Sequence, residues 1–416
     1  MPKQAPHPTN TLALGVVSAV FFLWGFITCL NDILIPHLKS LFTLSYGQSA
    51  LVQFTFFGAY FIFSLPAGKV VSRIGYQKSI SLGLGIAALG ALAFYPAASL
   101  SSFGLFLAAL FLLAAGITFL QVAANPFVTL LGPEESAPSR LNLAQALNAL
   151  GTTLAPAFGS LLILSVAVLS AEEVSKLSEG AKDAYHAAQA QAVQGPYLLL
   201  AAALALLAAF IYFFRLPSFT KEQGGGGLKK IFEALKVSHL SLGVLALFLY
   251  VGAEVSIGSF LINFIADPKI GNMSENAAAH YVAFYWGGAM VGRFAGAALL
   301  KRFDAGRMLG FAAVIAGALV LAAMLTQGFT AIIFIVAVGL FNSIMFPTIF
   351  SLGIRGLGRL KEEGASLLIM AIVGGAILPL AHGFLADQVG LQLAFGLPFL
   401  CYLYIAHYGF RGSRAS

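Results

Sequence analysis

Leu120-Gln121-Val122-Ala123-Ala124-Asn125-Pro126-Phe127-Val128-Thr129-Leu130-Leu131-Gly132 is an apolar stretch that carries Gln121, Asn125 and Thr129 at helical spacing. Residues spaced i, i+4 and i+8 lie above one another on one face of a helix. Amide groups cost free energy in hydrocarbon unless they face a polar cavity or a hydrogen-bonding partner. Pro126 removes one helical hydrogen bond beside them and loosens the backbone. The stretch therefore predicts the wall of a polar pathway through a membrane.

The composition of the chain agrees with a membrane setting. It is 59% hydrophobic and 9% charged, with a mean hydropathy of +0.90, whereas soluble domains have about 25% charged residues. Apolar runs of about 20 residues, long enough to span a bilayer, lie near 12–38, 46–71, 78–98, 102–131, 140–169, 196–216, 239–266, 276–300, 306–326, 330–354, 364–386 and 391–410. We therefore expect an all-α membrane protein with twelve transmembrane helices.

The basic residues indicate the orientation of these spans. Lys and Arg gather in alternate connections, at Lys69–Lys78, Arg215–Lys236, Lys301–Arg307 and Arg355–Lys361. The connections on the opposite side hold only Lys39, Lys176, Lys182 and Lys269. Because positive loops stay in the cytoplasm, both termini are predicted to be cytoplasmic. The net charge of +7 is thus a topology signal and predicts no nucleic-acid partner.

The chain is predicted to consist of two related halves. Residues 217–238 include Gly224–Gly227 followed by Lys229 and Lys230, the composition of a flexible linker. This linker would separate an N-terminal six-helix bundle, 1–216, from a C-terminal six-helix bundle, 239–416. The halves repeat their Gly and Pro positions at offsets of 221 and 223 residues: Pro126 and Gly132 match Pro347 and Gly353, and Gly151 and Pro156 match Gly374 and Pro379. Paired repeats with interrupted helices are typical of transporters with a site between the halves near the midplane.

Asp32 is the first charged residue within a predicted span. Thr28 lies one turn before it, and the neighbouring residues are apolar. A carboxylate in a span costs roughly 2.5 to 3.5 kcal/mol, so it normally faces a cavity and marks an ion or proton path. The alternative is a residue near the outer end of the span that meets interfacial water.

Glu254 is the second intramembrane carboxylate, one turn after Tyr250. If the repeat aligns Trp24 with Tyr250, Asp32 and Glu254 could face one cavity from opposite halves. Arg293 could neutralise Glu254 in a structural ion pair. Its place eight residues before Lys301 instead favours snorkelling or a gate on the cytoplasmic side. We assign Asp32 and Glu254 to proton coupling and Glu254 also to substrate binding.

Binding of a polar substrate with several hydroxyls requires amides and carboxylates for those hydroxyls and an aromatic side chain for an apolar face of the substrate. The predicted substrate-binding residues are Gln121, Asn125, Gln145, Asn148, Tyr250, Glu254, Trp286 and Asn342. Thr152 lies on the same helix face as Gln145 and Asn148, and Tyr285 and His382 are further candidates. For Asn342, Tyr285 and His382 the alternative is a packing role or a hydrogen bond between helices, which is the common role of an isolated polar group in a span.

Several segments carry a family resemblance. The loop Gly68–Lys78 is similar to the signature loop between helices 2 and 3 of the major facilitator superfamily, with Ser72 where that family usually has Asp. More specific segments resemble the bacterial family of fucose:proton symporters and glucose/galactose transporters: Phe22–Phe26, Asn31–Leu34, Gln121–Gly132, Arg140–Gln145, Phe248–Val255, Gly292–Gly296 and Phe346–Ile354. These segments cover both halves of the chain.

The resemblance implies a fold and several roles. It implies the major facilitator fold of two pseudo-symmetric six-helix bundles, in the inner membrane of a bacterium, and a gating role for Lys69, Arg73 and Arg293. It also implies that Asp32 is the proton carrier, because an Asp on this helix is the proposed carrier of the fucose symporters. Those carriers have an acidic residue at the position of Gln121.

The sequence contains no feature of an enzyme: no Walker loop, no metal-ligand cluster and no nucleophile constellation. Without an ATP site, uphill transport must use an ion gradient. We therefore predict a monomeric secondary active sugar importer that moves a hexose, 6-deoxyhexose or amino sugar with a proton, by alternating access and without a cofactor or metal. Two alternatives stay open: a sodium-coupled sugar symporter and a non-transporting membrane sugar sensor.

Overall fold

The computed structural model describes residues 9–42, 46–100, 102–162, 171–219 and 228–414. Within these ranges, the description of side chains excludes 30–42, 46–50, 156–162, 171–172, 183, 186, 190–193, 228 and 275–276. The described residues form helices and no strand, which confirms the all-α prediction. Asp32 belongs to α1 (Thr11–Phe42), but its side chain is among those that the structure does not describe.

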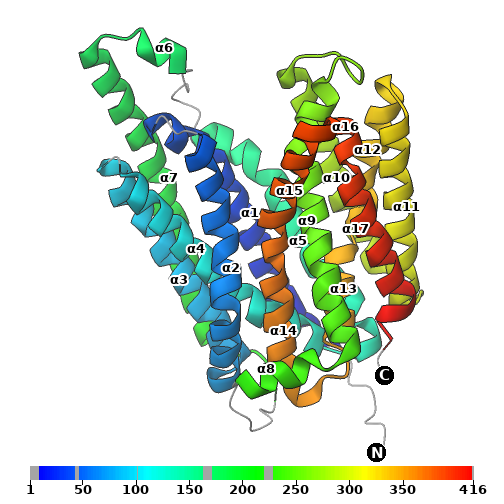
Figure 1. Cartoon of the computed structure of the whole chain (residues 1–416). Helices are drawn as coiled ribbons and strands as arrows, with labels where there is room; N and C mark the ends of the chain where they lie inside the picture. Colours follow the sequence, from blue (N-terminus) through cyan, green and yellow to red (C-terminus); the bar gives the residue numbers. More distant parts are fainter. Residues whose placement is uncertain (1–8, 43–45, 101, 163–170, 220–227, 415–416) are drawn as a thin grey trace, which may run out of the picture. The chain divides into compact units, whose positions relative to one another are not determined.

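The helices follow the predicted spans in order (Figure 1). The N-terminal ones are α1 (Thr11–Phe42), α2 (Tyr46–Ile74), α3 (Tyr76–Ser99), α4 (Phe103–Leu130), α5 (Ala137–Leu162), α6 (Ala171–Ser175) and α7 (Glu179–Phe213). The C-terminal ones are α8 (Leu228–Leu235), α9 (Ser238–Ala266), α10 (Glu275–Leu299), α11 (Ala305–Leu325), α12 (Gly328–Asn342), α13 (Met345–Gly353), α14 (Lys361–Met370), α15 (Gly374–Val389), α16 (Leu391–Ala394) and α17 (Gly396–His407).

Each of the twelve predicted spans overlaps one helix or two consecutive helices, and residues 163–169 of the span 140–169 lie outside the described residues. Among the described residues, 10 of these segments are long and apolar enough to cross a membrane. The other two are α5 and α10, which carry several polar side chains, such as Gln145 on α5 and Arg293 on α10. Polar side chains lower the mean hydropathy of a span, which sets these two helices apart from the other ten segments.

Two of the predicted spans are broken helices. The span 330–354 divides into α12, which ends at Asn342, and α13, which begins at Met345. The span 364–386 divides into α14 and α15, with the 3₁₀ turn Ala371–Val373 between them. By contrast, α4 continues through Pro126 to Leu130. The first break exposes buried backbone carbonyls that require partners other than the helix.

The chain forms two compact units. The first comprises Met1–Ser18, Asn125–Ala146 and Lys221–Ser416, and the second comprises Ala19–Ala124 and Leu147–Thr220. The boundaries of these units fall within α1, α4 and α5. The predicted division of the chain at the linker 217–238 stays a prediction.

In the second unit, glycines allow α3 and α4 to approach each other closely. A Cβ at Gly90 would lie 2.3 Å from the backbone nitrogen of Leu113, and a Cβ at Gly116 would lie 2.3 Å from that of Ala87. Small residues at such contacts give the van der Waals packing that joins helices within a membrane. Farther along α3, Phe94 stacks on Tyr197 of α7 with ring centroids 4.1 Å apart.

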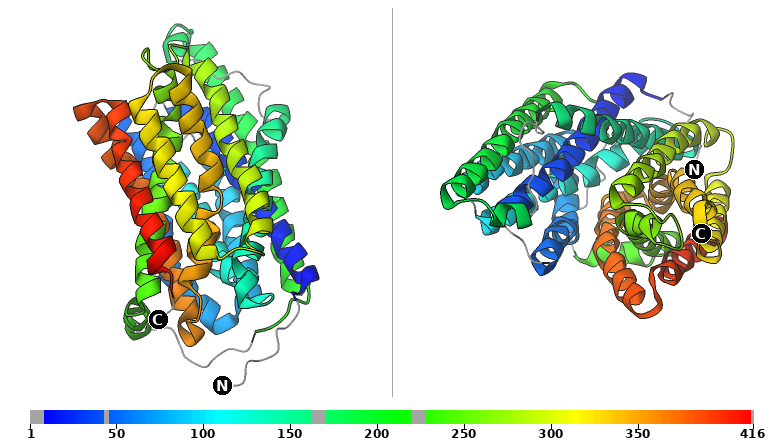
Figure 2. Two further views of the ribbon diagram at one scale, coloured as in Figure 1. Left: turned by 90° about the vertical axis from the view of Figure 1, so that its right-hand side faces the viewer. Right: turned by 90° about the horizontal axis from the view of Figure 1, so that it is seen from above.

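In the first unit, α9 is packed against α10, α13, α15 and α17. Close backbone contacts position these helices: a Cβ at Gly374 would lie 2.1 Å from the carbonyl oxygen of Phe248, and one at Gly339 would lie 2.1 Å from that of Tyr285. Helices α11, α12 and α17 lie side by side around this core (Figure 2). The middle of α9 is therefore enclosed by other helices of the unit.

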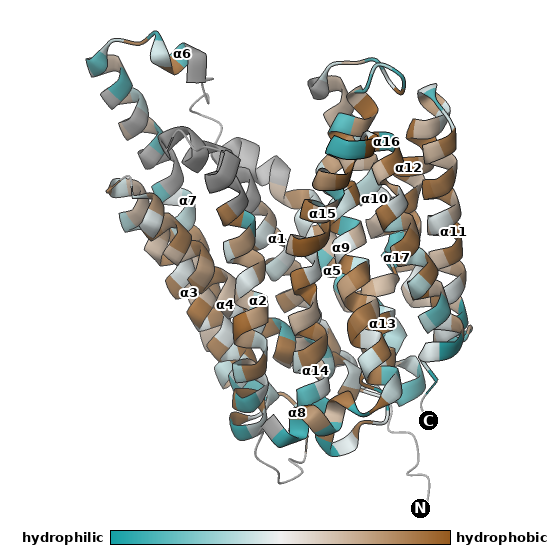
Figure 3. Ribbon diagram, viewed as in Figure 1, coloured by the Kyte–Doolittle hydropathy of each residue, from teal (hydrophilic) through white to brown (hydrophobic). Residues whose placement is uncertain are grey.

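Large apolar side chains remain exposed on the outer faces of the helices. On α7, Leu199, Leu206 and Phe213 are 59%, 72% and 80% exposed. Hydrophobic residues cover most of the length of the helices, whereas hydrophilic residues gather near α8 and at the Ala305 end of α11 (Figure 3). An exposed apolar surface of this extent requires a hydrocarbon environment.

Candidate functional site

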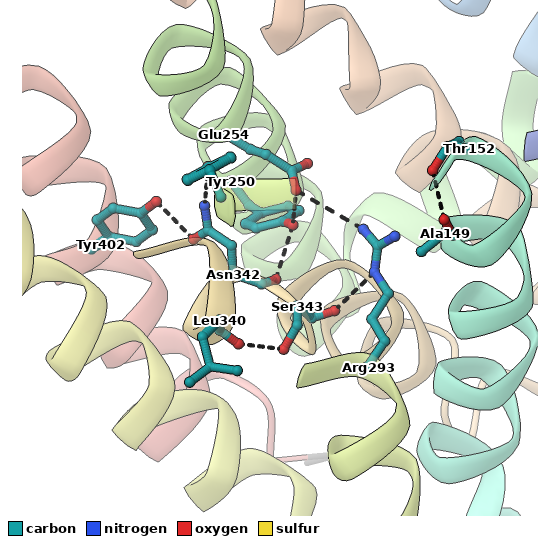
Figure 4. Close-up of polar contacts among 10 residues, drawn as sticks. Ala149, Thr152, Tyr250, Glu254, Arg293, Leu340, Asn342, Ser343 and Tyr402 are labelled. Atoms are coloured by element: carbon teal, nitrogen blue, oxygen red, sulfur yellow. Dashed lines mark hydrogen bonds and ion pairs between the residues drawn. The ribbon is translucent and has the colours of Figure 1, made fainter. Parts of the chain in front are cut away.

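Glu254 lies near the middle of α9 beside a cation and a hydroxyl group (Figure 4). The hydroxyl of Tyr250, one turn earlier, donates to Glu254 Oε1 at 2.8 Å. Arg293 of α10 brings its Nη2 to 4.0 Å from the same oxygen, and both side chains of this pair are 14% exposed. Charges withdrawn from water in this way persist when they are paired or serve function.

Asn342 ties the end of α12 to three other helices. Its Nδ2 donates to the hydroxyl of Tyr285 at 2.8 Å, and its Oδ1 accepts from the hydroxyl of Tyr402 at 2.7 Å. Its backbone oxygen accepts from Tyr250 at 3.0 Å. The side chains of Asn342 and of all three tyrosines are completely buried. Because each end of the amide has a partner, Asn342 fixes the positions of α9, α10 and α17 around the break.

Arg293 also contacts the break. Its Nε donates to the carbonyl oxygen of Ser343 at 3.3 Å. In a continuous helix this oxygen would accept from residue 347, but Pro347 has no N–H. Gly292 permits the approach, since a Cβ there would lie 2.4 Å from Ser343 Oγ. The sequence thus creates a free carbonyl at the break and supplies Arg293 to satisfy it.

These residues form what we call the Glu254 cluster: Tyr250, Glu254, Tyr285, Arg293, Asn342 and Tyr402. Both contacts of the carboxylate use Oε1. A carboxylate, a guanidinium and phenolic hydroxyls can together bind the hydroxyls of a polyol or hold a proton. The structure thus brings together five residues singled out from the sequence: Tyr250, Glu254, Tyr285, Arg293 and Asn342. The structure pairs Arg293 with Glu254, as the ion-pair alternative predicted. The gating role of Arg293 stays a prediction.

Two of the predicted amides lie in the second unit and link its helices. Gln121 on α4 is 5% exposed, and its Nε2 donates to the hydroxyl of Tyr60 on α2 at 2.8 Å. Asn148 on α5 donates from Nδ2 to the carbonyl oxygen of Phe21 on α1 at 2.9 Å. Gly25 makes this possible, because a Cβ there would lie 2.1 Å from the backbone oxygen of Asn148.

The other two predicted amides, Asn125 and Gln145, face each other in the first unit. Gln145 Nε2 donates to Asn125 Oδ1 at 3.4 Å, and both side chains are buried. Among the described residues, the buried Nδ2 of Asn125 has no hydrogen-bond partner. An unsatisfied buried donor costs about 1 to 3 kcal/mol, so this N–H group is available to donate to a ligand or a water molecule.

Trp286 and His382 lie outside the hydrogen-bonded cluster. Trp286 is 42% exposed and packs edge-to-face on Tyr285, with ring centroids 5.1 Å apart. His382 on α15 is completely buried between Phe260 and Phe395, with ring centroids 4.7 and 4.8 Å away. Neither ring nitrogen of His382 has a hydrogen-bond partner in the part of the chain that the structure describes. The predicted stacking of Trp286 on a sugar stays a prediction.

The family model of the Major Facilitator Superfamily matches residues 12–370. The chain belongs to this superfamily. It is a multi-pass membrane protein with the all-helical superfamily fold, as the resemblance implies. Within the part that the structure describes, no group of three or more His, Cys, Asp or Glu residues could hold a metal ion.

Individual members of the superfamily match the chain over nearly its whole length. A glucose/galactose transporter of Brucella abortus biovar 1 (strain 9-941) is 53% identical over 100% of this chain and 99% of its own. The L-fucose-proton symporter of Escherichia coli (strain K12) is 37% identical over 95% of this chain and 91% of its own. The crystal structure of a superfamily transporter, FucP, in the outward conformation superposes with a TM-score of 0.90 at 37% identity, covering 96% of this chain and 98% of FucP. These matches confirm the resemblance to the fucose and glucose/galactose carriers.

The superfamily loop joins α2 to α3 by a left-handed glycine. Gly75 has φ 85°, a conformation that suits glycine, and α3 begins at the next residue. Ser72 donates from Oγ to the carbonyl oxygen of Lys69 at 2.9 Å. Lys69 and Arg73 are exposed in the last turns of α2. Their gating role stays a prediction.

Two tyrosines of these hydrogen-bonded sites were not predicted from the sequence. Tyr402 on α17 donates to Asn342, and Tyr60 on α2 accepts from Gln121. Each lies in a predominantly apolar run, where an aromatic residue resembles simple packing. The available signal was the need of each buried amide for a partner on another helix, which indicates a hydroxyl without indicating which one.

Proposed function

We propose that this chain is a secondary active sugar importer that moves a monosaccharide together with a proton by alternating access. The full-length similarity to a glucose/galactose transporter and to an L-fucose-proton symporter supports the substrate class and the proton. The observation that carries the proposal is the Glu254 cluster, in which a carboxylate and an arginine are held within transmembrane helices among hydroxyls and an amide. The named relatives are transporters, in agreement with the prediction that the chain is not an enzyme.

Each residue of the site has a proposed role. A proton that enters across 100 mV contributes about 2.3 kcal/mol, and Asp32 and Glu254 are the proposed carboxylates for this coupling. The proposed sugar contacts are the carboxylate of Glu254, the amides and the aromatic side chains: Gln121, Asn125, Gln145, Asn148, Tyr250, Trp286 and Asn342. No cofactor is required, because the proton gradient supplies the free energy.

The proposal includes the setting of the transporter. The chain would act as a monomer in the bacterial inner membrane, with both termini in the cytoplasm. Two six-helix bundles, 1–216 and 239–416, would alternate access across the linker 217–238. Lys69, Arg73 and Arg293 would gate the cytoplasmic side. The loop similarity and the charge distribution support this arrangement.

Counterflow in proteoliposomes tests the function. Vesicles loaded with one unlabelled sugar are diluted into the same labelled sugar, over a panel of hexoses, 6-deoxyhexoses and amino sugars. We expect transient accumulation of at least one sugar in sodium-free buffer. Binding without counterflow for every sugar would indicate a sensor, and counterflow that requires sodium would indicate sodium coupling. Either result would contradict the proposal.

A further inference from the structure

The hydroxyl of Tyr250 has two acceptors and one hydrogen. Its oxygen lies 2.8 Å from Glu254 Oε1 and 3.0 Å from the backbone oxygen of Asn342. A phenol carries a single O–H donor, so Tyr250 can donate fully to only one of the two at a time. The side chain of Tyr250 is completely buried, so bulk water cannot take the place of the missing bond.

The charge of Glu254 decides which acceptor receives the hydrogen. Hydrogen bonds to an ionised carboxylate are roughly twice as strong as those between neutral groups, so ionised Glu254 attracts the hydroxyl. When a proton or a sugar hydroxyl occupies Oε1, the carboxylate no longer needs Tyr250. The O–H can then rotate to Asn342, and the Tyr250 oxygen can accept from a protonated Glu254.

The second acceptor belongs to the broken helix. Asn342 is the last residue of α12, and α13 begins three residues later at Met345. Arg293 makes a parallel connection, because it lies between Glu254 Oε1 and the carbonyl oxygen of Ser343. The carbonyl oxygens of Asn342 and Ser343 therefore share their donors with Glu254.

We infer that Tyr250 is a positioning residue that couples the binding of a proton or a sugar hydroxyl at Glu254 to the hydrogen bonding of the break between α12 and α13. This inference rests on the proposed function, which supplies the arriving donor as a proton or a sugar hydroxyl. No proton is lost in the step. The arriving proton or sugar hydroxyl engages Glu254 Oε1, and the hydrogen of the Tyr250 hydroxyl turns from Oε1 to the backbone oxygen of Asn342. The break gains one hydrogen bond and tightens.

Among the described residues, few other titratable groups lie near the hydroxyl of Tyr250 and its two acceptors. Helix α10 supplies Arg293 and Tyr285, and α17 supplies Tyr402, which meets Asn342 rather than Glu254. Helix α13 contains no titratable side chain. His382 on α15 packs between Phe260 and Phe395. Tyr250 is thus the hydroxyl that bonds both to Glu254 and to the break.

Hydrogen–deuterium exchange of the segment 341–349 in nanodiscs, at one fixed pH, measures the break directly. One arm replaces Glu254 by Gln, which imitates the protonated carboxyl, and the other adds a saturating sugar identified by counterflow. Each arm is repeated in Tyr250→Phe. The matched control is Tyr402→Phe, which removes another completely buried phenolic hydroxyl bound to Asn342 but leaves Glu254 untouched.

We expect Glu254→Gln to slow exchange of this segment by roughly two- to tenfold, the effect of one hydrogen bond of ordinary net strength. The response should shrink in Tyr250→Phe, because only the connection through Arg293 to Ser343 remains there, and it should persist in full in Tyr402→Phe. Slower exchange in both arms would show that a sugar hydroxyl, as well as a proton, can release Tyr250 from Glu254. Slower exchange in the Glu254→Gln arm alone would show that only the proton does so.

Two results would overturn the inference: no change in Glu254→Gln, or a change of the same size in Tyr250→Phe as in the protein with Tyr250. If Tyr250→Phe does not fold, comparison of Glu254→Gln with the wild type still decides, since unchanged exchange refutes the inference. Absence of counterflow for every sugar would refute the proposed function instead, and the Glu254→Gln arm would still test the switch.

Discussion

The ion pair between Glu254 and Arg293 should show a large energetic coupling. Glu254→Gln leaves the guanidinium with the Ser343 carbonyl, and Arg293→Gln leaves the carboxylate with Tyr250. Each single substitution therefore leaves one charge in a site where the side chains are only 14% exposed. The double variant removes both charges and keeps side chains of similar size.

The distance between the charged atoms sets the magnitude. At 4.0 Å, an effective dielectric constant of about 20 gives roughly 4 kcal/mol of attraction before the cost of desolvation. Breaking a fully buried pair costs about 3 to 5 kcal/mol. The charged atoms of this pair are far apart for an ion pair and both side chains are slightly exposed. We therefore expect each single variant to lose about 1 to 3 kcal/mol of its free energy of unfolding. The double variant should return to within about 1 kcal/mol of the wild type, because a pair replaced by neutral groups is often neutral in stability.

Denaturant titration in mixed micelles gives the free energy of unfolding for all four proteins of the cycle. The matched control is the exposed pair of Glu233 and Arg359, whose side chains are 33% and 65% exposed and whose coupling should be about 0 to 1 kcal/mol. If the losses of the two Glu254-cluster variants add in the double variant, the residues are not coupled, and the reasoning from their distance and burial is refuted.

The remaining predictions concern binding and coupling. Gln145→Ala or Asn148→Ala should weaken sugar binding by roughly 1 to 3 kcal/mol, because polar groups in the site lose their partner; unchanged affinity by calorimetric titration in both variants would remove these residues from the site. Trp286→Ala should raise the dissociation constant while the protein stays monodisperse in detergent, and aggregation without a specific binding defect would instead assign Trp286 to packing. Asp32→Asn should keep sugar exchange down a gradient but lose proton-driven accumulation, whereas Glu254→Gln should impair binding or exchange itself; undiminished accumulation in Asp32→Asn would contradict its assignment. Asn342→Leu should destabilise the protein by about 2 to 6 kcal/mol, since it leaves two buried tyrosine hydroxyls unsatisfied, and combining it with Tyr402→Phe should recover part of that loss in denaturant titration.

The spans could be predicted because apolar length alone determines which segments can cross a membrane. The break between α12 and α13 was only partly predictable. Pro347 indicates that the Ser343 carbonyl lacks a helical partner, yet Pro126 lies four residues before the end of α4, and that helix is not broken. Whether a proline breaks a helix depends on the groups available to satisfy the freed carbonyl, and those come from other helices.

The sequence predicts which residues of the candidate site are functional candidates better than it predicts which of them contact one another. Glu254, Tyr250 and Asn342 stand out because polar groups are costly within a span. Their pairing follows from the packing of α9 against α10, α12 and α17, which spacing along the sequence does not contain. Arg293 shows the difference: its separation from Lys301 favoured a gate, whereas Gly292 allows its side chain to reach Ser343 and Glu254.

Proton movement that accompanies sugar entry tests the central claim most directly. Proteoliposomes in sodium-free buffer are loaded with a pH-sensitive dye, and the sugar identified by counterflow is added outside. We predict acidification of the lumen that follows sugar uptake and disappears in Asp32→Asn. Sugar uptake without any pH change, or uptake that occurs only after sodium is added, would contradict proton-coupled sugar import.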